Sequence, residues 1–186
     1  SVEFLKSRPG QDAKSMLLEL ARKIIQFSHA EVLGSLLSFS LTMIEGPLLH
    51  TLSYGGRTRL YLVRRGKAEQ VAAAAVSRNA GIGGQVTNTE VETGYSNLPL
   101  QVGDKVILCT DGLYSMVSGT EEFAVVERYD NPTFSAKHLT SIAMGRNVEE
   151  NASAGVINYG KRITLKTSPA LIGGGIALVA LLAVGL

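Results

Sequence analysis

The residues of this chain whose types and spacing most clearly suit a chemical role are Asp111 and Gly112. They follow Lys105-Val-Ile-Leu-Cys-Thr110, whose apolar composition predicts a buried strand. A carboxylate at the end of such a strand, beside a glycine that lets a ligand approach the backbone, suits a hard cation such as Mg²⁺ or Mn²⁺. The same pair is also common in simple turns at strand ends. The residues alone leave both interpretations open.

A second candidate site is a group of arginines in one predicted hairpin. Guanidinium groups bind phosphates and carboxylates through paired hydrogen bonds, so such a group can receive a phosphate or an acidic partner. The alternative is a solvated hairpin edge with no ligand. The three histidines lie on separate predicted elements, and the single cysteine is expected to be an inert packing residue. The arginines are Arg57, Arg59, Arg64 and Arg65.

The composition narrows the possible functions. The chain has 186 residues, which suits one domain, and 18 Lys+Arg against 16 Asp+Glu give a net charge of +2. This balance, together with 6% aromatic residues and no Trp, argues against a nucleic-acid partner. One cysteine excludes an intramolecular disulfide and any multi-cysteine metal site.

The hydrophobic periodicity predicts an α+β order of elements. An amphipathic helix is expected over 12–30, because apolar residues recur there at helical spacing at Leu17, Leu20, Ile24 and Phe27. Residues 72–97 are rich in Ala, Asn and Gly and lack a clear period, so we expect a flexible excursion there. The other expected elements are strands at 36–44, 48–54, 58–64, 67–71, 98–104, 105–110 and 152–159, and helices starting near 121 and covering 133–144.

The C-terminal end differs from the rest of the chain. Residues 169–186 are all apolar or glycine, and eighteen such residues can just span a hydrocarbon core of about 30 Å as a helix. We therefore predict a transmembrane helix over 169–186. The linker before it, 161–168, contains Lys161, Arg162 and Lys166. By the positive-inside rule, the domain over 1–160 is then expected on the cytoplasmic side of the membrane.

The predicted membrane helix also carries a face of small residues. Such a face lets another transmembrane helix approach closely, which makes other membrane protein subunits the expected partners. The alternative is that glycine is simply common in membrane helices. The residues of this face are Gly173, Gly174 and Ala177.

Several motifs in the correct order resemble a known family. The sequence Gly103-Asp104, followed by Leu108-Cys-Thr-Asp-Gly-Leu113, resembles the late signature of type-2C metal-dependent protein phosphatases, the PPM family. Leu60-Tyr-Leu-Val-Arg-Arg-Gly66 is similar to the family's hairpin after its Gly-Asp-Ser-Arg motif. Supporting matches are Gly81-Ile-Gly-Gly84 and Glu150-Asn-Ala-Ser153. The resemblance covers roughly residues 4–159.

The resemblance implies both a fold and a chemistry. The fold is a four-layer αββα sandwich of two antiparallel sheets flanked by helices, to which our reading of 169–186 adds one C-terminal transmembrane helix. The chemistry is hydrolysis of phosphoserine and phosphothreonine by a water held between two Mg²⁺ or Mn²⁺ ions. On the matching positions, the resemblance makes Asp111 the catalytic carboxylate of an active enzyme. It implies metal binding by Asp111, Gly112 and Glu150.

The chain departs from the family's pattern at the metal motifs. Lys6-Ser7 stands where the early Asp-Gly is expected, and Gly56-Arg57-Thr58-Arg59 has lost the acid of the Gly-Asp-Ser-Arg motif. If Arg8-x-x-Gln11-Asp12 is instead the family's opening signature, a metal motif is missing from this sequence.

We therefore predict a membrane-anchored pseudophosphatase that serves as a non-catalytic accessory subunit and needs no metal. The alternative is an active Mg²⁺- or Mn²⁺-dependent serine/threonine phosphatase. A third possibility is a module that binds a phosphoprotein through Arg57 and Arg59.

Overall fold

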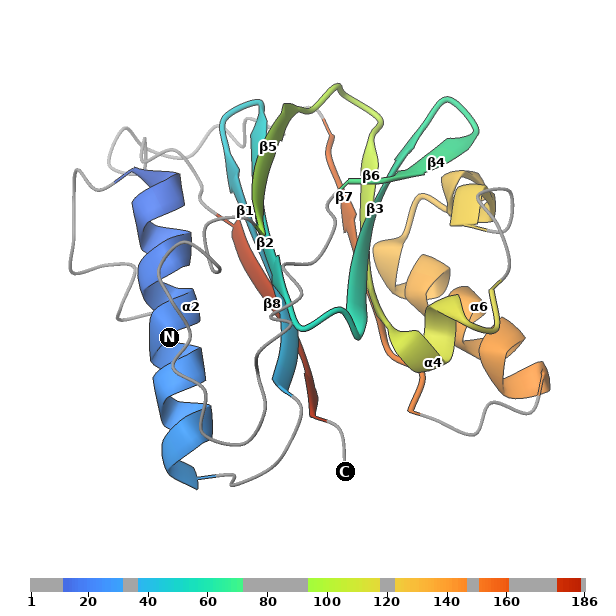
Figure 1. Ribbon diagram of the computed structural model, residues 1–186. Helices are drawn as coiled ribbons and strands as arrows, with labels where there is room; N and C mark the ends of the chain where they lie inside the picture. The colour runs from blue at the N-terminus through green and yellow to red at the C-terminus, as the bar shows by residue number, and fades with distance from the viewer. Residues whose placement is uncertain are drawn as a thin grey trace, which may run out of the picture.

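The computed structural model describes residues 12–31, 37–71, 94–117, 123–146, 151–160 and 177–184. In these residues, two antiparallel sheets lie face to face, with one long helix on the outside of the first and shorter helices on the outside of the second (Figure 1). The expected αββα order of layers is confirmed for this part of the chain.

The first layer is helix α2 (Ala13–Glu31). Asp12 caps its start, because its carboxylate accepts hydrogen bonds from the Ser15 backbone N–H at 3.0 Å and from the Ser15 hydroxyl at 2.6 Å. The helix was expected, but its buried face is rotated from the predicted one, since Phe27 is 68% exposed. The side chains buried against the first sheet are Ala13, Met16, Leu17, Leu18, Ala21 and Ile25.

The first sheet has the strand order β5-β2-β1-β8. Its central hairpin joins β1 (Leu37–Glu45) to β2 (Leu48–Tyr54), close to the ranges predicted from sequence. β5 (Tyr95–Pro99) starts within the segment expected to be an irregular excursion and ends just inside the strand predicted at 98–104. Its pairing with β2 explains the difference, because hydrogen bonds to a neighbouring strand override weak local preference. The rest of that excursion, 72–93, lies outside the described residues.

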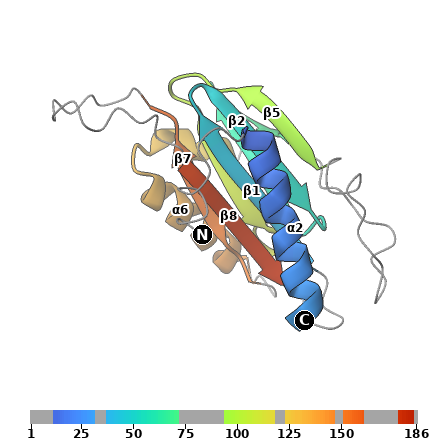
Figure 2. The same cartoon turned by 90° about the vertical axis from the view of Figure 1, so that its left-hand side faces the viewer.

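β8 (Ala177–Val184) corrects the predicted membrane helix. Its backbone pairs antiparallel with β1, from Leu37↔Val184 to Ile44↔Ala177, so the helix prediction is wrong for these eight residues (Figure 2). A short apolar run without charges fits a strand as well as a helix, and the open edge of β1 selects the strand. Within the described ranges, no helix is long and apolar enough to cross a membrane. Residues 161–176 and 185–186 lie outside those ranges.

The second sheet has the order β4-β3-β6-β7. Its strands are β3 (Thr58–Arg64), β4 (Lys67–Gln70), β6 (Lys105–Thr110) and β7 (Ala154–Asn158), again near the predicted ranges. β6 lies in the middle of the sheet and is buried along its whole length, as its apolar sequence predicted. The sheet therefore holds the end of β6, and with it Asp111, in a fixed place.

The outer layer on the second sheet consists of α4 (Asp111–Tyr114), the 3-10 helix η1 (Val125–Arg128) and α6 (Pro132–Gly145). These helices share a core with the outward face of the sheet, in which Tyr61 stacks on Phe123 with ring centroids 4.2 Å apart. Cys109 is buried in this core, and burial raises the pKa of its thiol to about 12. The thiolate that would react is therefore scarce at neutral pH, as expected of an inert packing residue.

Asp104, which belongs to the Gly103-Asp104 match of the sequence, forms an ion pair with Arg64. Its side chain is 2% exposed, and its carboxylate accepts hydrogen bonds from Arg64 Nε at 2.8 Å and from Arg64 Nη2 at 2.6 Å. Burial works to raise the pKa of Asp104, but the hydrogen bonds from Arg64 and from the Gln101 backbone outweigh it. The pKa therefore lies below its usual range.

We expect this pair to give the domain part of its acid sensitivity. Because the folded pKa of Asp104 lies below the unfolded value of about 3.9, the stabilisation is complete above that pH and is lost as the pH falls through the folded pKa. Asp104→Asn should lower the free energy of unfolding by about 2 kcal/mol at pH 7 and flatten its decline in acid. Denaturant titrations between pH 7 and pH 2 measure this. Asp130→Asn, in an exposed loop, is the control, and an equal effect there would contradict the assignment.

Candidate functional site

The candidate site lies where β6 ends and β3 begins. The antiparallel register of these strands pairs Thr58 with Thr110, so the residues just outside the pair, Arg57 and Asp111, come together. The Asp111 backbone N–H donates a hydrogen bond to the Arg57 carbonyl oxygen at 2.9 Å. Asp111 is also the first residue of α4, with its carboxylate at the N-terminus of that short helix.

The side chains of Arg57 and Asp111 form an ion pair. Arg57 Nε donates to Asp111 Oδ2 at 2.5 Å, and the Gly112 backbone N–H donates to Asp111 Oδ1 at 3.1 Å. The pair is partly shielded from water, with 31% of the Arg57 side chain and 19% of the Asp111 side chain exposed. Both oxygens of the carboxylate that the sequence offered as a metal ligand are therefore already engaged by hydrogen-bond donors.

The backbone around Arg57 is fixed by the neighbouring sheet. Gly55 and Gly56 both have φ of +84°, which allows the tight connection from β2 to β3. The Arg57 backbone N–H donates to Ser38 Oγ at 2.8 Å, and the Ser38 hydroxyl donates to the Tyr54 carbonyl oxygen at 2.9 Å. Arg57 is thus held from β1 and from α4 at once.

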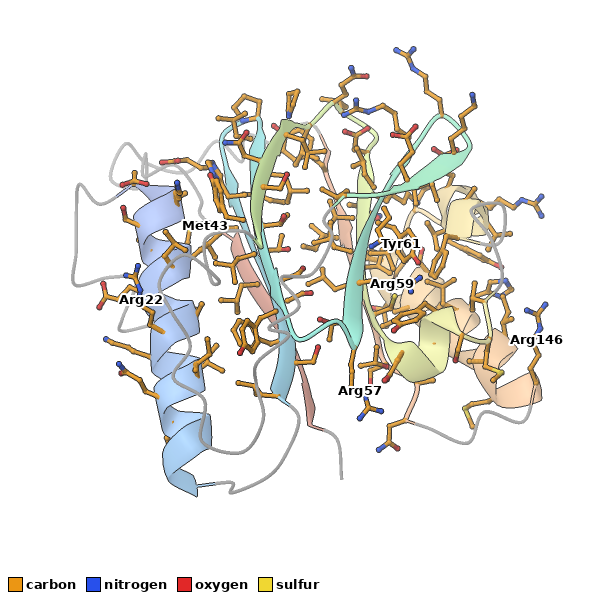
Figure 3. The ribbon with its side chains drawn as sticks, viewed as in Figure 1. Arg22, Met43, Arg57, Arg59, Tyr61 and Arg146 are labelled. Carbon is orange, nitrogen blue, oxygen red and sulfur yellow. The ribbon has the colours of Figure 1, made fainter. Side chains whose placement is uncertain are left out.

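Arg59 has a different environment from Arg57. It lies on the side of β3 that faces the helices, with its guanidinium carbon 3.7 Å from the centre of the Tyr114 ring (Figure 3). Burial works to lower its pKa, but a hydrogen bond with Tyr61 and the nearby Tyr114 more than offset this, so the pKa of Arg59 lies above its usual range. The group therefore stays charged and acts as a packed, stacked cation.

The arginines predicted as one cluster form two groups. Arg57 and Arg59 lie beside α4, whereas Arg64 pairs with Asp104 at the opposite end of β3. Arg65 follows Arg64 in the turn to β4, with an unusual φ of +51°. The first pair therefore belongs to the candidate site and the second pair does not.

Glu150, the other proposed metal ligand, lies outside the described residues. The segment directly after it is tied to the end of β6. The Thr110 hydroxyl donates to the Asn151 carbonyl oxygen at 2.9 Å, and the Ser153 backbone N–H donates to Thr110 Oγ1 at 2.9 Å. Asn151 and Ser153, the described polar residues of the Glu150-Asn-Ala-Ser153 match, thus lie at the same end of the sandwich as Asp111. The proposed packing residues Gly173 and Gly174 also lie outside the described ranges, and Ala177 begins β8.

The described residues do not fit a two-metal centre. No group of three or more His, Cys, Asp or Glu side chains that could hold a metal ion occurs among them. Asp111 has a guanidinium on one oxygen, and a second cation, Arg59, stacks on the same short helix. Among the described residues, a divalent cation would meet at this point one carboxylate, Asp111, which is already neutralised by Arg57 and lies near a further positive charge, Arg59.

Comparison with solved structures identifies the fold. The serine/threonine phosphatase PstP/Ppp of Mycobacterium tuberculosis aligns with a TM-score of 0.67 and 21% identity, over 86% of this chain and 77% of that chain. PppA, a key regulatory component of T6SS in Pseudomonas aeruginosa, aligns with a TM-score of 0.61 and 19% identity, over 84% and 76%. The catalytic domain of PstP in complex with two manganese ions aligns with a TM-score of 0.59 and 21% identity, over 84% of this chain and 79% of that chain.

These similarities define the class of fold. The chain has the fold of the PPM-type serine/threonine phosphatases, as the sequence motifs implied. No protein-family model and no curated protein sequence matches it. At these identities the likeness shows the fold alone, so activity must be argued from the residues of the site.

Two residues of the site were missed from sequence. Ser38 supports Arg57 from another strand, 19 residues away, and no motif links the two. Tyr114 lies three residues after Asp111, and its hydroxyl donates to the Gly56 carbonyl oxygen at 3.3 Å. Its place three residues after Asp111, on the same short helix, was the signal in the sequence that could have found it.

Proposed function

We propose that this chain is a non-catalytic PPM-like domain, a pseudophosphatase that works by binding. The observation that carries the proposal is the ion pair between Arg57 and Asp111. In an enzyme of this fold the carboxylate would be needed for metal ions, which must be surrounded by several anions to lie close together. Here the same carboxylate is neutralised by a side chain of the protein itself.

The test is hydrolysis of p-nitrophenyl phosphate by the full chain with Mn²⁺ or Mg²⁺. We expect no turnover above that of Asp111→Asn, while an active phosphatase of this fold, assayed in parallel, shows that the conditions are suitable. Mn²⁺-dependent turnover that disappears in Asp111→Asn would establish the alternative, an active serine/threonine phosphatase. Thermal unfolding of both proteins shows that each is folded during the assay.

The proposed partner is another membrane protein subunit, and the proposed place is the cytoplasmic face of a membrane. The support comes from the sequence alone: a basic linker over 161–168 precedes the charge-free run over 169–186, and Ala177–Val184 would have to leave β8 to enter a membrane. A membrane helix over 169–186 and the strand β8 exclude each other, because both use Ala177–Val184. Co-purification from detergent-solubilised membranes tests the partner, and a chain that always elutes alone would contradict it.

A further inference from the structure

We infer that Arg57 acts as an internal substitute for a metal cation, and that this end of the sandwich becomes a divalent-cation site when Arg57 is replaced by an acid. The inference rests on the proposed function, because it explains why the described residues do not fit a metal centre. It also goes further, since it names one side chain, Arg57, that blocks cation binding at the Asp111 carboxylate.

The geometry identifies Arg57 as that side chain. Its guanidinium contacts the carboxylate directly, and its carbonyl oxygen accepts the hydrogen bond from the Asp111 N–H. Main chain and side chain therefore both face the same residue. Ser38 fixes the Arg57 backbone, so the Cα of a different residue at position 57 would stay beside Asp111.

Arg59 does not compete for this role. Its guanidinium stacks on Tyr114 and bonds to Tyr61 on the helix-facing side of the sheet. It is attached to the core between β3 and the helices, and no described contact joins it to Asp111. Replacing Arg59 would therefore remove a packing contact and leave the Asp111 carboxylate still paired.

The electrostatic argument is direct. Hard divalent cations bind where two or more oxygen ligands carry enough negative charge, and a guanidinium beside the carboxylate removes that charge. Arg57→Asp changes the local charge by two units and puts a second carboxylate beside Asp111. The β2–β3 connection and the end of β6 already hold the two backbones together, so forming the site requires little reorganisation.

The experiment measures Mn²⁺ binding by the full chain, using electron paramagnetic resonance of the free ion and the Mn²⁺-induced shift in unfolding temperature. We expect Arg57→Asp to bind Mn²⁺ at least about tenfold more tightly than the wild type, a difference of about 1.4 kcal/mol. Adding Asp111→Asn to that variant should abolish the gain. If Arg57→Asp does not fold, Arg57→Gln removes the positive charge with a smaller change, and a gain of about threefold is expected.

Each result decides the inference separately from the proposed function. Folded Arg57→Asp with no gain in Mn²⁺ affinity would refute the inference, and the proposed function, a non-catalytic domain, would still stand. A gain that survives Asp111→Asn would place the ion elsewhere and also refute it. Tight Mn²⁺ binding by the wild type would refute it as well, and hydrolysis in the same sample would overturn the proposed function too. Arg64→Gln, which breaks the Arg64–Asp104 pair at the far end of β3, should gain no Mn²⁺ affinity, and an equal gain there would count against the inference.

Discussion

Deleting residues 161–186 should destabilise the domain by about 4 kcal/mol or more. The deletion removes β8, which pairs with β1 over eight residues, and each backbone hydrogen bond contributes about 0.5–1.5 kcal/mol. β8 also lies against β3 and β6 of the other sheet, so its loss opens the space between the sheets. The exposed edge of β1 should also promote aggregation.

Denaturant unfolding and hydrogen exchange measure this effect. In the full chain, β1 lies between β2 and β8, so its amide hydrogens should exchange slowly. The deletion should speed exchange most for the β1 amides that bond to β8, and to a smaller extent for the other protected amides, because global stability also falls. A deletion of residues 185–186 alone leaves β8 intact and is the control. If the chain without residues 161–186 keeps both its stability and its slow exchange, the apolar run is not a structural strand and is free to enter a membrane.

Gly55→Ala should cost about 3–4 kcal/mol of stability. An added Cβ would lie 2.2 Å from the Leu37 carbonyl oxygen and 2.8 Å from the Ser38 Cα, both of them backbone atoms that cannot turn aside. The φ of +84° adds about 1–2 kcal/mol for any residue with a side chain. The start of β1 would therefore have to move away from the turn that leads to Arg57.

Gly46→Ala provides a matched control. Gly46 also has a positive φ, of +56°, but nothing lies within 4 Å of its added Cβ. Gly46→Ala should therefore lower the free energy of unfolding only by the cost of a positive φ for a residue with a side chain, about 1–2 kcal/mol. Urea titrations of both variants give the difference. Equal losses would mean that the close approach of β1 to the β2–β3 turn does not contribute to stability.

The sequence predicted local structure well because neighbouring residues encode it. The alternation of polar and apolar residues gave β1, β2 and β3 to within one residue at each end. The apolar run before Asp111 gave a buried strand that ends at that carboxylate. The late motif also implied the fold that the comparison with solved structures supports.

Contacts between distant residues could not be predicted in the same way. The pairing of Arg57 with Asp111 joins positions 54 residues apart, and its backbone support from Ser38 comes from a strand in the other sheet. The sequence indicated that position 57 had lost an acid, but not that the arginine there neutralises the remaining one. That contact depends on the register between β3 and β6.

The C-terminal apolar run shows most clearly the difference between what the sequence determines and what the tertiary structure determines. Its composition determined that it must leave water, because eighteen residues without a charge or a polar side chain gain free energy by burial. Composition does not determine what the segment is buried against, since a lipid bilayer and the open edge of a sheet both satisfy it. Only the tertiary structure decided for β8, because the edge of β1 offers eight residues of backbone hydrogen-bond partners in register.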